Sequence, residues 1–169
     1  MKTQKNVFEI QENAFTQLEK RWALLTAAKP GGSVNTMTVS WGGLGILWGK
    51  PFAMIVVRPQ RYTLEFLEAS DVFTLTFFPE SRKEALSLCG VKSGRDTDKI
   101  KEAGLTPVRG ERGEVYFEEA DLVYVCKKSF RHHMRPEELL LPETAGEIYP
   151  DGDFHVIFFG EIVECLSEK

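Results

Sequence analysis

Three short segments of the chain concentrate polar and aromatic side chains that a hydrophobic core does not need. They are Asn35-Thr36-Met37-Thr38-Val39-Ser40-Trp41, Arg58-Pro59-Gln60-Arg61-Tyr62-Thr63 and Ser93-Gly94-Arg95-Asp96-Thr97-Asp98-Lys99. Arginine pairs well with phosphate, hydroxyl and amide groups donate hydrogen bonds, and an aromatic side chain offers a flat surface for a ring. These residue types indicate a site for a small ligand that is partly anionic.

The sequence motifs of several other common ligand and catalytic sites are absent from the chain. Gly45 and Gly49 enclose three residues where a phosphate-binding P-loop needs four, and a proline follows the next lysine. The three-glycine fingerprint of dinucleotide-binding folds is missing as well. His132 and His133 are adjacent, so on a strand they would face opposite sides, and neither has a metal ligand at a suitable spacing. The sequence therefore predicts no metal site, and it carries no nucleophile elbow for hydrolysis.

Composition limits the class of protein. The 169 residues are 43% hydrophobic, which is enough for one domain over 1–169 with its own core. A net charge of −4 argues against general affinity for nucleic acid. The longest uncharged run, residues 34–49, is too polar to span a bilayer, and we expect a cytoplasmic protein without membrane association. Cys89, Cys126 and Cys165 are widely spaced, so we expect reduced, mostly buried thiols.

The elements that must position these segments are mostly strands. Helical spacing predicts a helix over 13–21 with Asn13 as N-cap, and a capping box at Ser81 and Glu84 opens a helix through residue 88. Further helices are predicted over 63–69 and 96–103, and strands over 22–28, 37–41, 52–57, 72–77, 114–117, 122–130 and 155–165. This mainly β pattern with α inserts favours a barrel over a doubly wound sheet. Residues 131–153 are expected to form a long inserted loop, either an active-site cover or a family-specific decoration.

In this order, the three segments resemble the flavin reductase-like FMN-binding split β-barrels, especially the flavoredoxin-like branch. The resemblance runs from about residue 22 to residue 105 and returns at 152–155 and 160–163. It implies a split β-barrel, FMN as cofactor, and a homodimer with each flavin near the shared interface. The glycine-rich stretch after Trp41 departs from the family by adding Trp48, which would cover the ring or fill the dimer contact.

The resemblance also implies roles for individual residues. Residues of the strand segment would line the flavin ring, and Trp41 would pack on the ring or be an ordinary core tryptophan. Arg58 and Arg61, just before the helix at Thr63, would hold the phosphate. The turn at Ser93 and Gly94 would supply hydrogen-bond donors. The full cofactor-binding set is Asn35, Thr36, Met37, Thr38, Val39, Ser40, Trp41, Arg58, Arg61, Tyr62, Thr63, Ser93, Gly94, Lys99 and His155.

Two of these residues are catalytic candidates. Lys99 would place a cation near the flavin and favour its anionic reduced form, although a surface pair with Asp98 is the alternative. His155 would donate a hydrogen bond or a proton.

Three functions remain open. The first is an oxidoreductase in which FMN takes electrons from NADH or NADPH and passes them to free flavin or another small-molecule acceptor. The second is a flavoredoxin-type electron carrier that a partner protein reduces. The third is a split barrel that uses the pocket without redox chemistry. Because nicotinamide has no dedicated motif in this fold, the sequence does not separate the first two.

Overall fold

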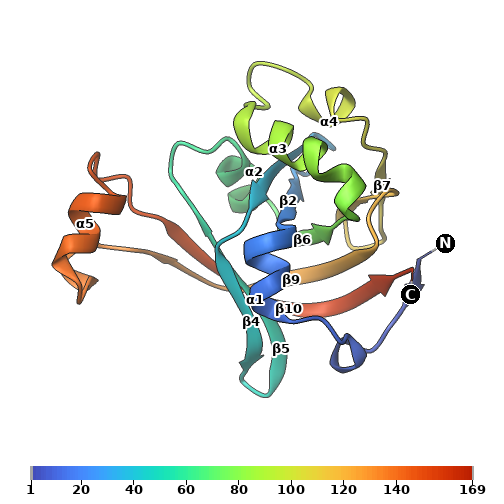
Figure 1. Cartoon of the computed structure of the whole chain (residues 1–169), viewed down its shortest axis with the longest axis horizontal. Helices are drawn as coiled ribbons and strands as arrows, with labels where there is room; N and C mark the ends of the chain where they lie inside the picture. The colour runs from blue at the N-terminus through green and yellow to red at the C-terminus, as the bar shows by residue number, and fades with distance from the viewer. Residues whose placement is uncertain (1, 169) are drawn as a thin grey trace.

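The computed structural model describes residues 2–168, apart from the side chain of residue 142, and its main feature is one curled antiparallel sheet (Figure 1). The strand order is β3-β2-β6-β9-β10-β5-β4, with β1 paired to β10 outside this path. A separate hairpin joins β7 to β8. The strands are β1 (Thr3–Gln4), β2 (Ala23–Ala28), β3 (Val34–Val39), β4 (Gly42–Leu47), β5 (Lys50–Val57), β6 (Val72–Phe77), β7 (Pro107–Arg109), β8 (Val115–Phe117), β9 (Leu122–His133) and β10 (Val156–Ser167).

The sheet curls into an open barrel because its two longest strands bend. The ladder between β9 and β10 shifts register between Phe159 and Gly160 and again between Ile162 and Glu164, and such bulges bend and twist a strand. At the first bulge a Cβ on Gly160 would lie 2.7 Å from Phe73 Cε1, so only glycine leaves room for the Phe73 ring against β10. In the described chain the edge strands β3 and β4 do not pair with each other, which is the split of a split barrel.

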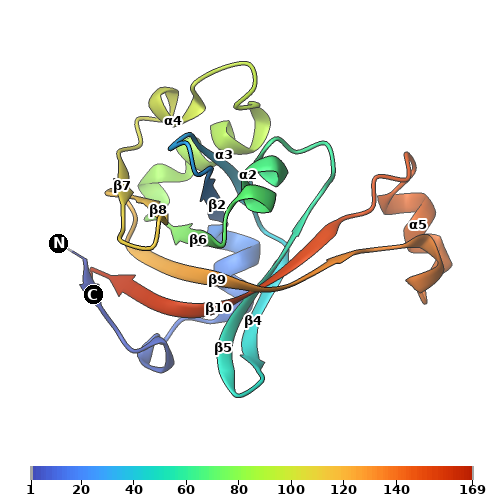
Figure 2. The same ribbon diagram turned by 180° about the vertical axis from the view of Figure 1, so that it is seen from behind.

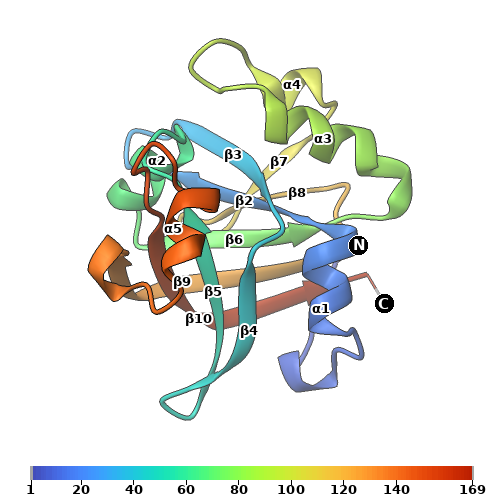
Figure 3. The ribbon, with the colours of Figure 1, turned by 60° about the vertical axis from the view of Figure 1, so that its left-hand side comes forward.

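Hydrophobic side chains fill both faces of the central strands. In β2, Leu25 points into the barrel with Phe73 and Phe158, whereas Leu24 packs on the opposite face with Leu86. Since both faces are covered, every residue of β2 is buried, including the polar Thr26, and the strand does not alternate between apolar and polar residues. The apolar cluster around Leu24 and Leu86 lies beneath α3 (Lys83–Val91). Helix α3 covers this face of the sheet, with α4 (Lys99–Glu102) beside it (Figure 3).

The predicted helices form, with differences at their ends. Asn13 caps α1 (Ala14–Thr16), which continues as a π-helical turn over Gln17–Arg21, but Phe15 is exposed and does not pack on the core. The helix over 63–69 is confirmed as α2 (Thr63–Ala69). The predicted capping box at Ser81 is wrong, because the chain enters α3 through a 3-10 turn over Glu80–Arg82 without a side-chain cap. The helix predicted over 96–103 shortens to α4, capped by Asp98.

The sequence analysis missed β4, which forms a hairpin with β5. The two-residue turn at Trp48 and Gly49 has φ of +53° and +72°, values typical of a tight hairpin turn. Three glycines weaken the strand signal of this segment, which explains why propensity did not indicate it. The hairpin projects from the barrel (Figure 1).

The prediction of a long loop over 131–153 is partly wrong, because this stretch contains the end of a strand and a helix. Strand β9 continues to His133, and the chain then forms a 3-10 turn (Pro136–Glu138) and helix α5 (Pro142–Ile148) before it returns into β10. We call residues 134–154 the arm, because they project from one side of the molecule (Figure 2). None of the helices within residues 2–168 is long and apolar enough to cross a bilayer. The three cysteines are free and buried, as predicted.

Candidate functional site

Two adjoining cavities form a groove at the open side of the barrel. The first, of about 180 Å³, is lined by Met37, Thr38, Val39, Ser40, Trp41, Val56, Arg58, Arg61 and His155. The second, of about 140 Å³, is lined by Asn35, Met37, Gln60, Arg61, Tyr62, Thr63, Cys89, Val91, Lys92, Ser93, Gly94 and Lys99. Met37 and Arg61 line both, so the cavities lie side by side. The tertiary structure therefore brings the three segments and His155 together.

Thr36 is the exception among the predicted site residues. Its Oγ1 lies 2.9 Å from Thr26 Oγ1 and donates to the carbonyl of Leu25 at 3.1 Å, so the side chain faces the buried side of β3. Asn35 and Met37, its neighbours on β3, line the groove, and alternation turns Thr36 to the opposite face, which it shares with Thr38. Thr38 does line the first cavity, although its hydroxyl donates to the carbonyl of Leu86.

Five residues of the groove were missed by the sequence analysis. Val56 and Cys89 lie on elements whose pattern indicated only core packing, and Val91 and Lys92 end a helix that was expected to stop earlier. Gln60 lies inside a quoted segment but was not assigned a role. Only Gln60 had a signal in the sequence that could have indicated it.

The two arginines expected to hold phosphate differ in their surroundings. Arg58 pairs with Asp153 and donates to the carbonyl of Ile148 at 2.8 Å, so its guanidinium is committed to the arm. Arg61 is exposed, and within residues 2–168 the one hydrogen bond of its guanidinium is a long contact of 3.4 Å from Nη1 to the carbonyl of Gly90. Arg61 is therefore the arginine that remains available to a ligand.

A close approach of the Gly94 backbone to the Asn35 side chain shapes the second cavity. A Cβ added to Gly94 would lie 2.1 Å from Asn35 Oδ1, so any larger residue would collide with that amide. Asn35 cannot move away freely, because its Nδ2 donates to Thr63 Oγ1 at 2.9 Å and the side chain is buried. The glycine thus lets the turn at Ser93 lie directly against β3 and α2.

Trp41 and His155 form one wall of the first cavity. Their ring centroids lie 5.7 Å apart, and Trp41 is 51% exposed. The interpretation of Trp41 as a core tryptophan is therefore wrong. His155 is buried, and burial together with the nearby charge of Arg58 lowers its pKa. The imidazole is accordingly neutral near pH 7.

Comparisons with known proteins agree with this geometry. The family model for the flavin reductase like domain matches residues 16–169. The chain belongs to the flavin reductase-like family. A comparison with curated proteins finds no match.

Three solved structures illustrate the shared fold of this flavin reductase-like chain. Flavoredoxin from Methanosarcina acetivorans has a TM-score of 0.71 at 20% identity, with 98% of this chain and 77% of that chain covered. An FMN-binding domain of a flavin reductases-like enzyme from Shewanella baltica has a TM-score of 0.70 at 16% identity, covering 99% and 78%. An NADH:FAD oxidoreductase from Streptomyces globisporus has a TM-score of 0.65 at 16% identity, covering 86% and 74%. Identities this low establish the split-barrel fold alone.

Within this flavin reductase-like domain, Lys99 has a structural task that the sequence did not indicate. The side chain is buried, and its Nζ donates to the carbonyls of Cys89 at 2.9 Å and Lys92 at 3.0 Å. Burial lowers the pKa of this ammonium. The surface pair with Asp98 is wrong, since Asp98 instead accepts from the backbone N–H of Lys101 at 3.1 Å. Lys99 lines the second cavity while it anchors the end of α3.

Trp48 lies apart from the groove. It is 70% exposed at the tip of the β4–β5 hairpin and lines a different cavity with Phe52 and Glu161. It therefore does not cover the groove of its own chain. Among the described residues, no cluster of three or more His, Cys, Asp or Glu side chains could hold a metal ion.

Proposed function

We propose that this chain binds FMN in the groove and is an oxidoreductase that transfers electrons from NADH or NADPH through FMN to free flavin or another acceptor. The observation that carries the proposal is the convergence of the three segments on a groove with Arg61 between its two cavities. Family membership over residues 16–169 supports it, as do the solved relatives described as FMN-binding.

The residues of the groove fit the two ends of FMN. FMN joins a flat aromatic ring to a phosphate, and the first cavity offers Met37, Val39 and Trp41 for the ring. The second cavity offers the Arg61 guanidinium and the donors of the turn at Ser93 and Gly94 for the phosphate. Arg58 is left out of the phosphate contacts because Asp153 neutralises it.

The bound flavin would supply the hydride-accepting and electron-releasing chemistry, which belongs to the cofactor. The task of this chain is to bind and orient the ring, to exclude water from one of its faces, and to aim a polar group at its edge. His155, buried in the wall of the first cavity, is the residue placed for that last role.

An electron carrier of the flavoredoxin type is the second candidate. The half-exposed Trp41 at the rim of the first cavity favours it, because a flat aromatic surface there could contact a partner protein. Flavoredoxins from Methanosarcina acetivorans and Desulfovibrio vulgaris share the fold. For either function we also propose a cytoplasmic homodimer with the flavin near the shared interface. Light scattering after size exclusion would test whether the protein is a dimer.

An anaerobic absorption spectrum separates these functions. The protein is saturated with FMN, freed of unbound flavin, and measured before and after NADH and then NADPH, with free FMN at equal concentration as the control. Bleaching of a retained flavin band faster than in the control supports the reductase. A retained band that does not bleach supports the carrier, and a protein donor should then reduce it. The absence of a retained band contradicts both and favours a non-redox use of the groove.

A further inference from the structure

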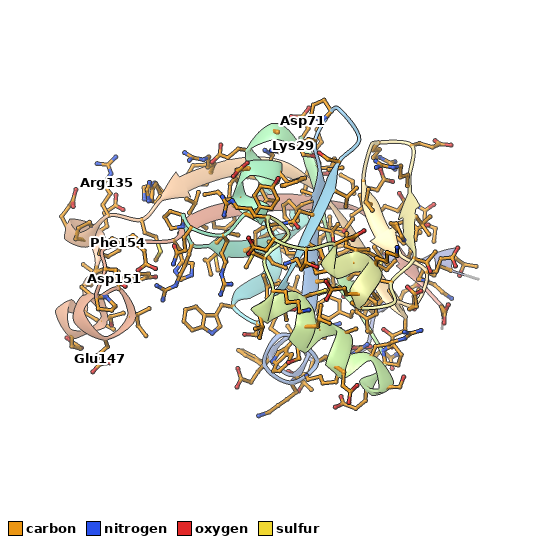
Figure 4. All side chains as sticks on the ribbon, turned by 90° about the horizontal axis from the view of Figure 1, so that it is seen from above. Lys29, Asp71, Arg135, Glu147, Asp151 and Phe154 are labelled. Carbon is orange, nitrogen blue, oxygen red and sulfur yellow. The ribbon has the colours of Figure 1, made fainter. Side chains whose placement is uncertain are left out.

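The arm contributes a residue, Tyr149, that contacts His155 in the wall of the first cavity. Tyr149, which follows α5, is buried with 8% of its surface exposed, and its ring stacks on Phe154 with centroids 4.6 Å apart. Figure 4 shows Phe154 on this arm together with Arg135, Glu147 and Asp151. The Arg58 guanidinium lies 5.3 Å from the centroid of the Tyr149 ring. The arm is thus fastened to the barrel where His155 enters β10.

One hydrogen bond joins Tyr149 to His155. The phenol oxygen of Tyr149 lies 2.8 Å from His155 Nδ1 and 3.6 Å from Met134 Sδ. Burial raises the pKa of Tyr149, so the phenol keeps its proton and must donate it. A neutral imidazole nitrogen is a much stronger acceptor than a thioether sulfur, so the proton goes to Nδ1.

The groups around His155 keep the imidazole neutral. Arg58 and Arg61 face it from the loop after β5, and Asp153 faces it from the arm. Trp41 packs against it from the segment after β3, and the Tyr149 ring meets it edge-on with centroids 5.4 Å apart. Because Arg58 and Asp153 pair with each other, their charges largely cancel at the imidazole. A neutral imidazole carries one proton, and Nδ1 is already an acceptor.

We propose that Tyr149 is a positioning residue that holds His155 as the Nε2–H tautomer, so that His155 presents a hydrogen-bond donor to the occupant of the first cavity. Nδ1 is engaged by Tyr149, which leaves Nε2 as the ring nitrogen for a ligand. The matching ligand edge is an acceptor, such as a carbonyl oxygen or an unprotonated ring nitrogen. That this edge belongs to a flavin rests on the proposed function, whereas the tautomer does not.

Long-range ¹⁵N–¹H correlation spectra of the FMN-free, histidine-labelled full chain test the proposal. The chain has 3 histidines, so a His132→Gln, His133→Gln variant leaves only the signals of His155. Near neutral pH we expect a proton on Nε2 and an unprotonated, hydrogen-bonded Nδ1. A proton on Nδ1 would overturn the proposal.

Single substitutions in that background test the role of Tyr149. Tyr149→Phe keeps the stacked ring but removes the donor, so the Nδ1 signal should move to that of a free nitrogen and the Nδ1–H tautomer should become populated. Met134→Leu should leave the tautomer unchanged, as should the remote control Tyr116→Phe. An unchanged spectrum in folded Tyr149→Phe, or a switch of tautomer in Met134→Leu, would contradict the proposal. Because these spectra need no cofactor, a protein with the expected tautomer but without FMN binding would reject only the proposed function.

Discussion

Replacement of Arg61 by alanine tests which residue recognises the phosphate. Arg61 lines both cavities, and its side chain is exposed with one long contact to the carbonyl of Gly90, at 3.4 Å. A hydrogen bond to a charged group contributes about 1.5–3 kcal/mol, so Arg61→Ala should weaken FMN binding about 10- to 150-fold. Riboflavin lacks the phosphate, and its affinity should change less than about threefold on the same scale. The difference between the two ligands isolates the phosphate contact.

The assay is a fluorescence-quenching titration of the FMN-free protein with each flavin at fixed ionic strength. The Arg82→Ala variant is the matched control, because Arg82 also donates to a backbone carbonyl, that of Gly104 at 3.5 Å, outside the groove. Both variants should keep the free energy of unfolding within about 0.5 kcal/mol of the parent, since neither guanidinium supports the core. Equal weakening of FMN and riboflavin by Arg61→Ala would refute the assignment.

Three further predictions concern the scaffold of the groove. Gly94→Ala should lower the free energy of unfolding, measured by urea titration, by about 1–3 kcal/mol, because its Cβ would lie 2.1 Å from the buried amide oxygen of Asn35. The control Gly31→Ala, whose Cβ would have no atom within 4 Å, should leave the free energy of unfolding unchanged. Lys99→Met leaves two carbonyls without their donor and should cost about 1–3 kcal/mol by urea unfolding even without flavin; unchanged stability would contradict this anchoring role. The hydrogen bond from Arg58 lowers the pKa of Asp153 below its usual 3.8. The stabilisation of the arm by this pair is therefore complete above about pH 4, and it is lost as the pH falls through the lower pKa of Asp153 in the folded state. Hydrogen exchange of arm amides should therefore show protection that falls below about pH 4 and is already reduced in Asp153→Asn at neutral pH; protection independent of pH would contradict it.

The arm changes how the site should be understood. Arg58 belongs to the Arg58-Pro59-Gln60-Arg61 segment that was expected to bind phosphate. Its guanidinium instead pairs with Asp153, donates to the carbonyl of Ile148 and lies over the Tyr149 ring. It therefore acts on the groove by holding the arm against His155. The groove depends on residues that are far apart in the chain, and a change in the arm is expected to reach the flavin site through His155.

The sequence by itself determined the elements whose signal is local. Strand β6 and helix α2 have the predicted bounds, and Asn13 caps its helix, because alternation, helical spacing and side-chain capping act within a few residues. The order of the three polar segments also indicated the groove residues, since each segment carries hydrogen-bond donors and the first two add an aromatic side chain. Family resemblance supplied what spacing could not, namely that these segments meet.

Only the tertiary structure decided which side chains are free to act. Arg58 and Arg61 look equivalent in sequence, but Asp153, 95 residues away from Arg58, engages one and not the other. From the sequence, Lys99 was expected near the flavin or in a surface pair with Asp98, but its ammonium donates hydrogen bonds to the carbonyls of Cys89 and Lys92 at the end of α3. Strand β4 forms because β5 offers it a complete ladder, despite glycines that weaken its own propensity. Hydrogen bonds and ion pairs between distant segments depend on how the chain packs, and local residue patterns carry no record of those partners.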